Sequence, residues 1–180
     1  MINSNDNSSG MTKVKSTVNI GLCNPKSPTN VGAVMRAVSC FQANDVFYTG
    51  ERYDRAARFY TDTQDTALKT YLEEVTCLLE TVTEEIRVVC VELVEGAISL
   101  QEFEHPQHAL YIFGPEDGSI SQDLIDRADD VVYIPTVGCL NLAATVNVVL
   151  YDRSLKSVDE GAGNSLIRKS RNKHNRLTIK

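Results

Sequence analysis

The sequence predicts an α/β fold in which a parallel β-sheet carries helices on both faces. Short runs rich in Val, Ile, Leu and Cys alternate with segments in which apolar residues recur at helical spacing. This alternation is typical of strand–helix–strand units and of a parallel sheet. Hydrophobic residues make up 42% of the 180 residues, which suits the core of one ordinary domain.

Five apolar runs bounded by turn residues are predicted strands: 18–23, 45–49, 86–93, 109–113 and 131–134. Helices are predicted between and after them: from Asn30 to Phe41, over 64–79 with a break, over 121–128 with Ser121 as cap, and over 141–153. Residues 97–103 are predicted to form a short helix or turn. The first helix has an apolar stripe formed by Val31, Val34, Met35, Val38 and Phe41.

The region after the last strand is the most informative. The strand breaks at Pro135, passes through a short glycine-containing loop and enters a helix that is apolar on nearly every side. A helix that is apolar all round is buried. We therefore expect this last long helix to lie inside the domain, with Cys139, Leu140 and Asn141 inside it or at a cleft.

Two earlier strands also end in polar, glycine-bearing loops, over residues 24–32 and 114–118. Ligands of open parallel sheets bind beyond the carboxyl ends of the strands, so the three loops can form one site. Asn30 is predicted at a helix N-terminus, where free backbone N–H groups favour an anion. Arg36 lies off the apolar stripe and is free to face a ligand. The alternative is that Asn30 is only a helix cap and Arg36 only a solvated charge.

Glu116 follows a buried strand closely. It is a candidate general base, a group that orients a hydroxyl, or an acceptor for loop N–H groups. Gly114 and Gly118 suit a turn that lets a ligand reach the backbone. Asn141, at the start of the buried helix, needs hydrogen-bond partners, so it is either a clamp on its loop or a ligand contact.

The charge is unevenly distributed along the chain. Residues 161–180 carry six Lys and Arg residues and no acid, whereas residues 1–160 have a net charge of −12. An acidic body argues against non-specific coating of nucleic acid, and the basic tail is either a phosphate contact or a solvated end. We expect a disordered leader over 1–15, a domain over 16–155 and a basic tail over 156–180.

Several classes of protein are disfavoured. The five scattered cysteines lack a Cys-x-x-Cys pair, which favours reduced thiols in a cytoplasmic protein over a disulfide or zinc framework. No apolar stretch is long enough to span a bilayer, so no membrane is expected. His105 and His108 have no third ligand at useful spacing, so no metal is expected. The phosphate-loop, dinucleotide and hydrolase motifs are absent. Tyr and Phe residues interleaved with arginines over 51–60 either stack on RNA bases or cover an amphipathic helix.

The three loops, taken in order, resemble the motifs of a known family. N-x-G-x-x-x-R begins at Asn30, F-G-P-E-x-G begins at Phe113, and I-P-x-x-x-x-L-N begins at Ile134 and leads into the hydrophobic helix. This order is similar to the SpoU/TrmH group of SPOUT RNA methyltransferases, from about Val18 to Arg153, with 51–100 only loosely matched. The resemblance implies an α/β sheet whose C-terminal segment is threaded through a loop as a deep trefoil knot.

The resemblance also implies a cofactor, S-adenosylmethionine, held by the backbone of the knot loops. The implied contacts are Gly114, Ile134, Cys139 and Leu140, with Glu92 or Leu93 at the end of the preceding strand. Many members have Ser in place of Cys139. Because a thiol is a weaker hydrogen-bond donor, the contact expected there is through the backbone.

The implied reaction is 2′-O-methylation of a ribose, with Asn30, Arg36, Glu116 and Asn141 as the polar site residues. We expect the substrate to be tRNA, with rRNA as the alternative. The family usually forms homodimers through the knot, which would bring Arg36 near the cofactor of the other subunit. Because guanidinium is effectively always protonated, we expect Arg36 to stabilise the developing 2′-oxyanion, with Glu116 as proton acceptor or orienting group.

Two other classes of function are the alternatives. A non-catalytic RNA-binding protein with the same knot would bind the cofactor without transferring a methyl group, and the intact polar residues weigh against it. An unrelated α/β enzyme that uses a nucleotide would need the missing phosphate-loop motifs.

Overall fold

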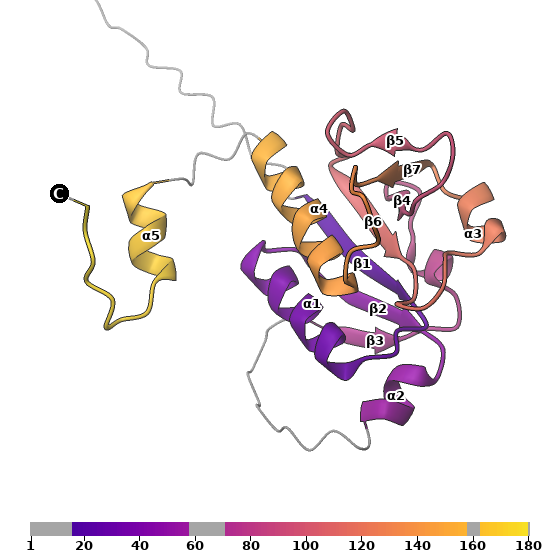
Figure 1. Ribbon diagram of the computed structural model, residues 1–180, viewed down its shortest axis with the longest axis horizontal. Coiled ribbons are helices and arrows are strands. Elements are labelled where there is room, and N and C mark those ends of the chain that lie inside the picture. The colour runs from indigo at the N-terminus through magenta and orange to yellow at the C-terminus, as the bar shows by residue number, and fades with distance from the viewer. Residues whose placement is uncertain (1–15, 58–70, 158–162, 180) are drawn as a thin grey trace, which may run out of the picture.

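A seven-stranded parallel sheet forms the centre of the computed structural model, which describes residues 16–57, 71–157 and 163–179 (Figure 1). The strands are Thr17–Cys23 (β1), Val46–Thr49 (β2), Leu72–Glu74 (β3), Arg87–Val91 (β4), Ile98–Ser99 (β5), His108–Phe113 (β6) and Asp130–Tyr133 (β7). Their order is β3-β2-β1-β6-β4-β7-β5, and every pairing is parallel. The predicted fold class is confirmed.

Helices cover both faces of the sheet. They are Pro28–Cys40 (α1), Arg52–Ala57 (α2), Gln122–Asp126 (α3), Leu142–Lys156 (α4) and Asn164–Ser170 (α5), with a 3-10 helix at Leu78–Thr81 (η1). Figure 1 shows α1 and α4 side by side over one face. Leu124 and Ile125 of α3 pack with Leu78 of η1 against the other face.

The core is divided by the sheet into two clusters, because successive side chains of a strand point to opposite faces. On the α1/α4 side, Ile20, Val89 and Tyr111 pack against Val34 and Val146. On the other side, Val88, Cys90, Leu110 and Ile112 pack against Leu78 and Ile120. Burial on both faces explains why the central strands are continuous apolar runs rather than alternating ones.

Helix α1 begins at Pro28 rather than at the predicted Asn30. Ser27 is the N-cap, and its Oγ accepts the Asn30 N–H at 3.3 Å, while Pro28 occupies the first turn, where its missing N–H has no consequence. Asn30 thus lies in the first turn, at the helix N-terminus as predicted, and the alternative that it is only the helix cap is wrong. Its side chain is left to make contacts outside the helix.

Two other predicted elements differ from the structure. The sequence predicts a helix over 64–79, of which 64–70 lie outside the described residues. The prediction is wrong for the described part, because residues 72–74 form β3 and 78–81 form η1. Pairing with β2 overrides the local helical pattern, since Val46 donates to Tyr71 O at 2.9 Å and Val75 to Tyr48 O at 2.8 Å. Within 97–103, Ile98–Ser99 form the short strand β5, paired with β7, which was not predicted, while residues 100–102 form a turn, one of the two predicted forms.

The prediction that the last long helix is buried all round is also wrong. Leu142, Ala143, Val146, Val149 and Leu150 of α4 face the core. The opposite face exposes Val148 at 37%, Tyr151 at 59% and Leu155 at 68%. A single chain has only one core for this helix to face, so the remaining apolar side chains reach solvent.

The ends of the chain are described only in part. The predicted leader, 1–15, lies outside the described residues, as do Arg58, Phe59 and Tyr60. Within the basic tail, α5 forms a short helix, and residues 163–170 are all exposed. Across the described ranges, every helix is too short or too polar to cross a bilayer.

A polar network fastens the C-terminal end of α4 to the start of β6. The buried ring of His105 contacts Tyr111 Oη at 2.7 Å and Asp152 Oδ2 at 2.8 Å, and Lys156 Nζ lies 2.8 Å from the same Asp152 oxygen. Arg153 donates to Tyr111 Oη at 3.0 Å. Burial lowers the pKa of His105, although the hydrogen bond that its ring makes to the Asp152 carboxylate acts in the opposite direction.

We expect His105→Gln to reduce the dependence of stability on pH. Because the folded-state pKa of His105 lies below its usual value, the native ring stays neutral while the unfolded one takes up a proton. The contribution of His105 to the free energy of unfolding is therefore fully present above about pH 6.5 and is lost as the pH falls below that value. Urea unfolding at pH 7.5, 6.5 and 5.5 measures this, with the exposed His174→Gln as control. An equal decline in the His105 variant and the wild type would contradict it.

Candidate functional site

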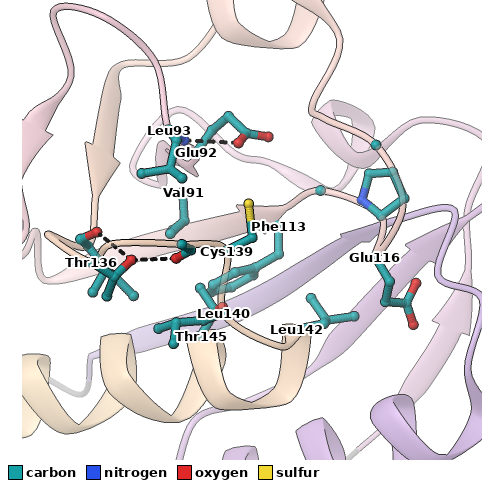
Figure 2. Close-up of a pocket in the computed structure, with 15 residues that line it drawn as sticks. Val91, Glu92, Leu93, Phe113, Glu116, Thr136, Cys139, Leu140, Leu142 and Thr145 are labelled. Carbon is teal, nitrogen blue, oxygen red and sulfur yellow. Dashed lines mark hydrogen bonds between the residues drawn. The ribbon is translucent and has the colours of Figure 1, made fainter.

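A pocket lies beyond the carboxyl ends of β4, β6 and β7 (Figure 2). Its walls come from the end of β4 and the residues after it, from the loop after β6, and from the loop between β7 and α4. The six residues predicted to contact a cofactor all line it: Glu92, Leu93, Gly114, Ile134, Cys139 and Leu140. The structure thus brings these six together, and their role toward a cofactor stays a prediction.

The pocket combines apolar walls with unused backbone donors. Val91, Phe113 and Leu142 contribute apolar surface together with several of the predicted residues. The loop before α4 is shaped by Thr136, whose Oγ1 donates to Gly138 O at 2.7 Å. Within the described part of the chain, the backbone N–H groups of 138–140 have no acceptor. Such groups are ready to bind a planar ligand with polar edges.

Glu92 ties the end of β4 to the loop after β6. Its Oε2 accepts the Ile120 N–H at 3.0 Å, and its Oε1 accepts the Leu93 N–H at 2.9 Å. Gly114 lies against this contact: a Cβ added there would be 3.2 Å from Glu92 Oε2 and 3.3 Å from Ile120 N. A side chain at this position would require Glu92 or Ile120 to shift by a few tenths of an ångström, so the close approach favours glycine.

Glu116 gathers donors from the first loop at the edge of the pocket. Its Oε2 accepts the Lys26 N–H at 2.8 Å, and its Oε1 accepts the Ser27 N–H and the Asn30 side-chain amide, both at 3.0 Å. Partial burial alone would raise the pKa of Glu116, but the Asn30 amide and backbone N–H groups outweigh it and lower the pKa. The carboxylate is therefore ionised and well supplied with donors, which makes it a weak base.

Asn141 extends the same network to α4. Its Nδ2 donates to Asn30 Oδ1 at 3.0 Å, while its Oδ1 accepts the Ala143 N–H at 2.9 Å and the Ala144 N–H at 3.4 Å, so it caps the helix. Of the two expected placements, the interior and a cleft, Asn141 takes the second, because it is exposed between two residues that line the pocket. The expected need for partners is confirmed. Asn141 can serve both as a clamp on its loop and as a ligand contact, since a ligand in the pocket can reach its exposed side chain.

Arg36 is not part of this cluster. It is exposed on α1, does not line the pocket, and its side chain makes no hydrogen bond or ion pair with the described residues. Gly32 is exposed on the same helix, with open space around it. A single chain therefore brings together three of the four predicted polar residues and leaves Arg36 apart.

Sequence reasoning missed several contributors to the site. The donors at Lys26 and Ser27 are backbone groups, although Ser27-Pro28 is a recognisable helix start that would have placed them. The ion pair between Arg52 and Asp117 joins residues 65 positions apart, and no local signal announces it.

The histidines are used elsewhere in the structure. His105 belongs to the network at the end of α4, and His108 Nδ1 accepts the Thr17 N–H at 3.2 Å. Among the described residues, no group of three or more His, Cys, Asp and Glu side chains is arranged to hold a metal ion.

These features define a class: a parallel α/β protein with a pocket beyond the carboxyl ends of its strands, one wall of which is the loop that enters α4. The model of the SpoU rRNA methylase family matches residues 17–151. The chain belongs to the SpoU rRNA methylase family.

Solved structures share this fold. An rRNA methyltransferase from Sinorhizobium meliloti is 15% identical in sequence and has a TM-score of 0.65. The match covers 82% of this chain and 60% of the chain of that enzyme. The SpoU methyltransferase AviRb from Streptomyces viridochromogenes, in complex with AdoMet, is 19% identical with a TM-score of 0.66, covering 79% and 58%. A structure described by the 2-OH methylation of C/U34 on tRNA is 22% identical with a TM-score of 0.62, covering 79% and 97%.

The chain thus spans about 60% of the length of the first two relatives. Comparison with curated proteins gives no significant match. The shared fold is the SPOUT α/β knot, as predicted.

We expect Gly114→Ala to destabilise the protein by about 1 kcal/mol, since the new methyl group must displace Glu92 or Ile120. Gly138→Ala is the matched control. It lies in the same pocket with nothing within 4 Å of its added Cβ, so the change is neutral or slightly stabilising. Urea denaturation of both variants measures the difference. Equal effects would contradict the close approach at Gly114.

Proposed function

We propose that this protein is an S-adenosylmethionine-dependent RNA methyltransferase that methylates the 2′-oxygen of a ribose in tRNA. The observation that carries the proposal is the pocket, which joins the six predicted cofactor residues and opens beside the Asn30–Glu116–Asn141 network. Membership of the SpoU family and the AdoMet bound to AviRb support it. The relative described with tRNA supports that substrate, because this chain covers 97% of it and only 60% of the rRNA methyltransferase.

The pocket fits S-adenosylmethionine on its own chemistry. Its apolar side chains suit an adenine ring, and the unused N–H groups of 138–140 suit the polar edge of that ring. When bound, this cofactor supplies a methyl group already activated on a sulfonium. The chain must then hold the ribose oxygen in line with that methyl and let the oxygen lose its proton.

Glu116 acts in this proposal as an orienting group rather than as the base. Three donors hold its carboxylate and its pKa is lowered, so it fixes the Asn30 amide and the first loop in place. Asn30 and Asn141, at the edge of the pocket, are then placed to contact the ribose. The proton of the ribose hydroxyl is then accepted by water, which reaches the site at the open edge of the pocket.

Arg36 enters the site from a second copy of the chain. Within one chain it is exposed and does not line the pocket, and α4 exposes Val148, Tyr151 and Leu155 on a face that a partner would cover. A twofold dimer makes the same patch contact itself. We propose that this contact brings Arg36 of one subunit to the pocket of the other, where it stabilises the developing 2′-oxyanion.

The basic tail serves RNA binding in the same proposal. Its six cations follow α4 on an acidic body, and their contacts with phosphates position an RNA without reading its sequence. A cytoplasmic location agrees with such a substrate and remains a prediction.

Calorimetry and a methyl-transfer assay test the function together. S-adenosylmethionine or its demethylated product should bind, while NAD and ATP should not. Unmodified tRNA and rRNA transcripts, incubated with labelled cofactor and digested to nucleosides, should show a 2′-O-methyl product by mass spectrometry from tRNA. Preference for NAD would overturn the proposal. Cofactor binding without transfer to any RNA would indicate the non-catalytic RNA-binding alternative.

We expect Arg36→Ala to lower turnover by about a hundred- to thousand-fold, which is the usual effect of removing one donor aimed at developing negative charge. Folding should be unaffected, because Arg36 is exposed. Turnover is measured on the unmodified RNA that the wild type methylates. A melting curve checks folding, and light scattering checks the oligomeric state, which should be a dimer for the wild type. Near-normal turnover, loss of folding, or full activity of a wild-type monomer would contradict the shared site. Arg55→Ala, exposed on α2, is the matched control.

A further inference from the structure

A bidentate ion pair lies at the edge of the site. Arg52, at the start of α2, holds Asp117 of the loop after β6, with Nη1 2.9 Å from Oδ1 and Nη2 2.9 Å from Oδ2. Lys26, from the loop after β1, brings its Nζ to 3.5 Å from Asp117 Oδ2. We call these three residues the rim cluster. Three separate segments of the chain converge on one carboxylate.

The rim cluster adjoins the polar network at the pocket edge. Asp117 is the neighbour of Glu116 in sequence, and the backbone N–H of Lys26 donates to Glu116 Oε2 at 2.8 Å. Lys26 therefore contacts both carboxylates, one through its backbone and one through its side chain. A polymer whose ribose reaches the pocket must pass its phosphates close to this edge.

The ion pair contributes little to holding the fold. The side chains of Lys26 and Asp117 are 64% and 50% exposed, and that of Arg52 is 29% exposed. Exposed ion pairs add little stability, since water and salt screen them. The loop after β6 is held independently by the donors on Glu116 and by the Glu92–Ile120 contact.

The two parallel hydrogen bonds that Arg52 makes to Asp117 have the geometry with which a guanidinium also binds a phosphate. Guanidinium donates two parallel hydrogen bonds to a carboxylate or to a phosphate with the same fork. The Arg52 contact keeps the pKa of Asp117 below its usual value, so a charged oxyanion occupies the fork. Lys26 supplies a second cation beside it.

We propose that Asp117 occupies, in the free protein, the place that an RNA phosphate takes between Arg52 and Lys26. The inference rests on the proposed function, because it takes the bound polymer to be RNA. On binding, two phosphate oxygens replace the carboxylate oxygens of Asp117 on the Arg52 fork, and Asp117 turns to solvent. Asp117 is thus an internal competitor that lowers the affinity for phosphate alone.

Opposite effects of the two partners test this. The affinity of purified bulk tRNA is measured against salt concentration for the wild type, Arg52→Gln and Asp117→Asn. Asp117→Asn should bind about two- to five-fold more tightly, which corresponds to the release of one exposed ion pair. Arg52→Gln should bind more weakly and flatten the slope of log affinity against log salt by about 0.7–0.9.

A matched ion pair controls for net charge. Arg87 and Asp130 lie at the amino ends of β4 and β7, the edge opposite the site, with Nη2 and Oδ2 3.0 Å apart. Arg87→Gln and Asp130→Asn change the charge equally and should leave tRNA affinity unchanged. Shifts equal to those of the rim variants would mean that only net charge matters, and would overturn the inference.

Two further outcomes would also overturn it. Equal weakening by Arg52→Gln and Asp117→Asn would show that the pair only positions its loop. Weaker binding of the demethylated cofactor to Arg52→Gln, measured by calorimetry, would assign the fork to the carboxylate of the cofactor. Failure of the wild type to methylate any RNA would instead overturn the proposed function. It would leave the phosphate site standing, since that site is measured from tRNA affinity.

Discussion

The carboxylate of Glu116 is the interaction on which the candidate site depends. It accepts two backbone N–H groups and the Asn30 amide, and Asn30 in turn accepts from Asn141, the cap of α4. The loops after β1, β6 and β7 are thereby joined by one chain of hydrogen bonds. Bonds to an ionised acceptor are stronger than neutral ones. Loops otherwise free to move independently are held in a single arrangement at the edge of the pocket.

Helix α4 connects this network with the rest of the molecule. Its first turn is capped at the site, its inner face packs against α1 and the sheet, and its outer face presents apolar side chains to solvent. A substitution on the inner face therefore acts on the core, and through the cap on the pocket. A substitution on the outer face leaves both intact and acts only on what covers that face.

Much of the fold follows from the sequence because the central strands are buried on both faces. The runs that form β1, β6 and β7 are mostly apolar, with Asn19 the one buried polar residue of β1, and no competing pattern obscures them. β3 was missed because its pairing with β2, rather than its own residues, makes it a strand. The exposed face of α4 was missed because an apolar residue carries no sign of whether a core or solvent lies beside it.

The candidate site, like the fold, has a part that the sequence predicts and a part that only the packing determines. The rule that ligands bind at the carboxyl ends of parallel strands, with the family resemblance, named six of the fifteen residues that line the pocket as cofactor contacts, and the Asn30–Glu116–Asn141 set. The sequence could not indicate that the Asn30 amide bridges the other two, because that depends on where three loops meet. Nor could it pair Arg52 with Asp117, which only the packing of α2 beside the loop after β6 brings together.

The two anchors of α4 restrict how the pocket exchanges its contents. Asn141 fixes one end at the site, while Asp152, Arg153 and Lys156 fix the other end near the start of β6, about 22 Å away for a 15-residue helix. A rod held at both ends cannot swing aside as a lid. Any change in the shape of the pocket therefore falls to residues 135–140, which are exposed and where backbone hydrogen bonds are few. A ligand reaches the pocket through its open edge while α4 and the sheet keep their positions.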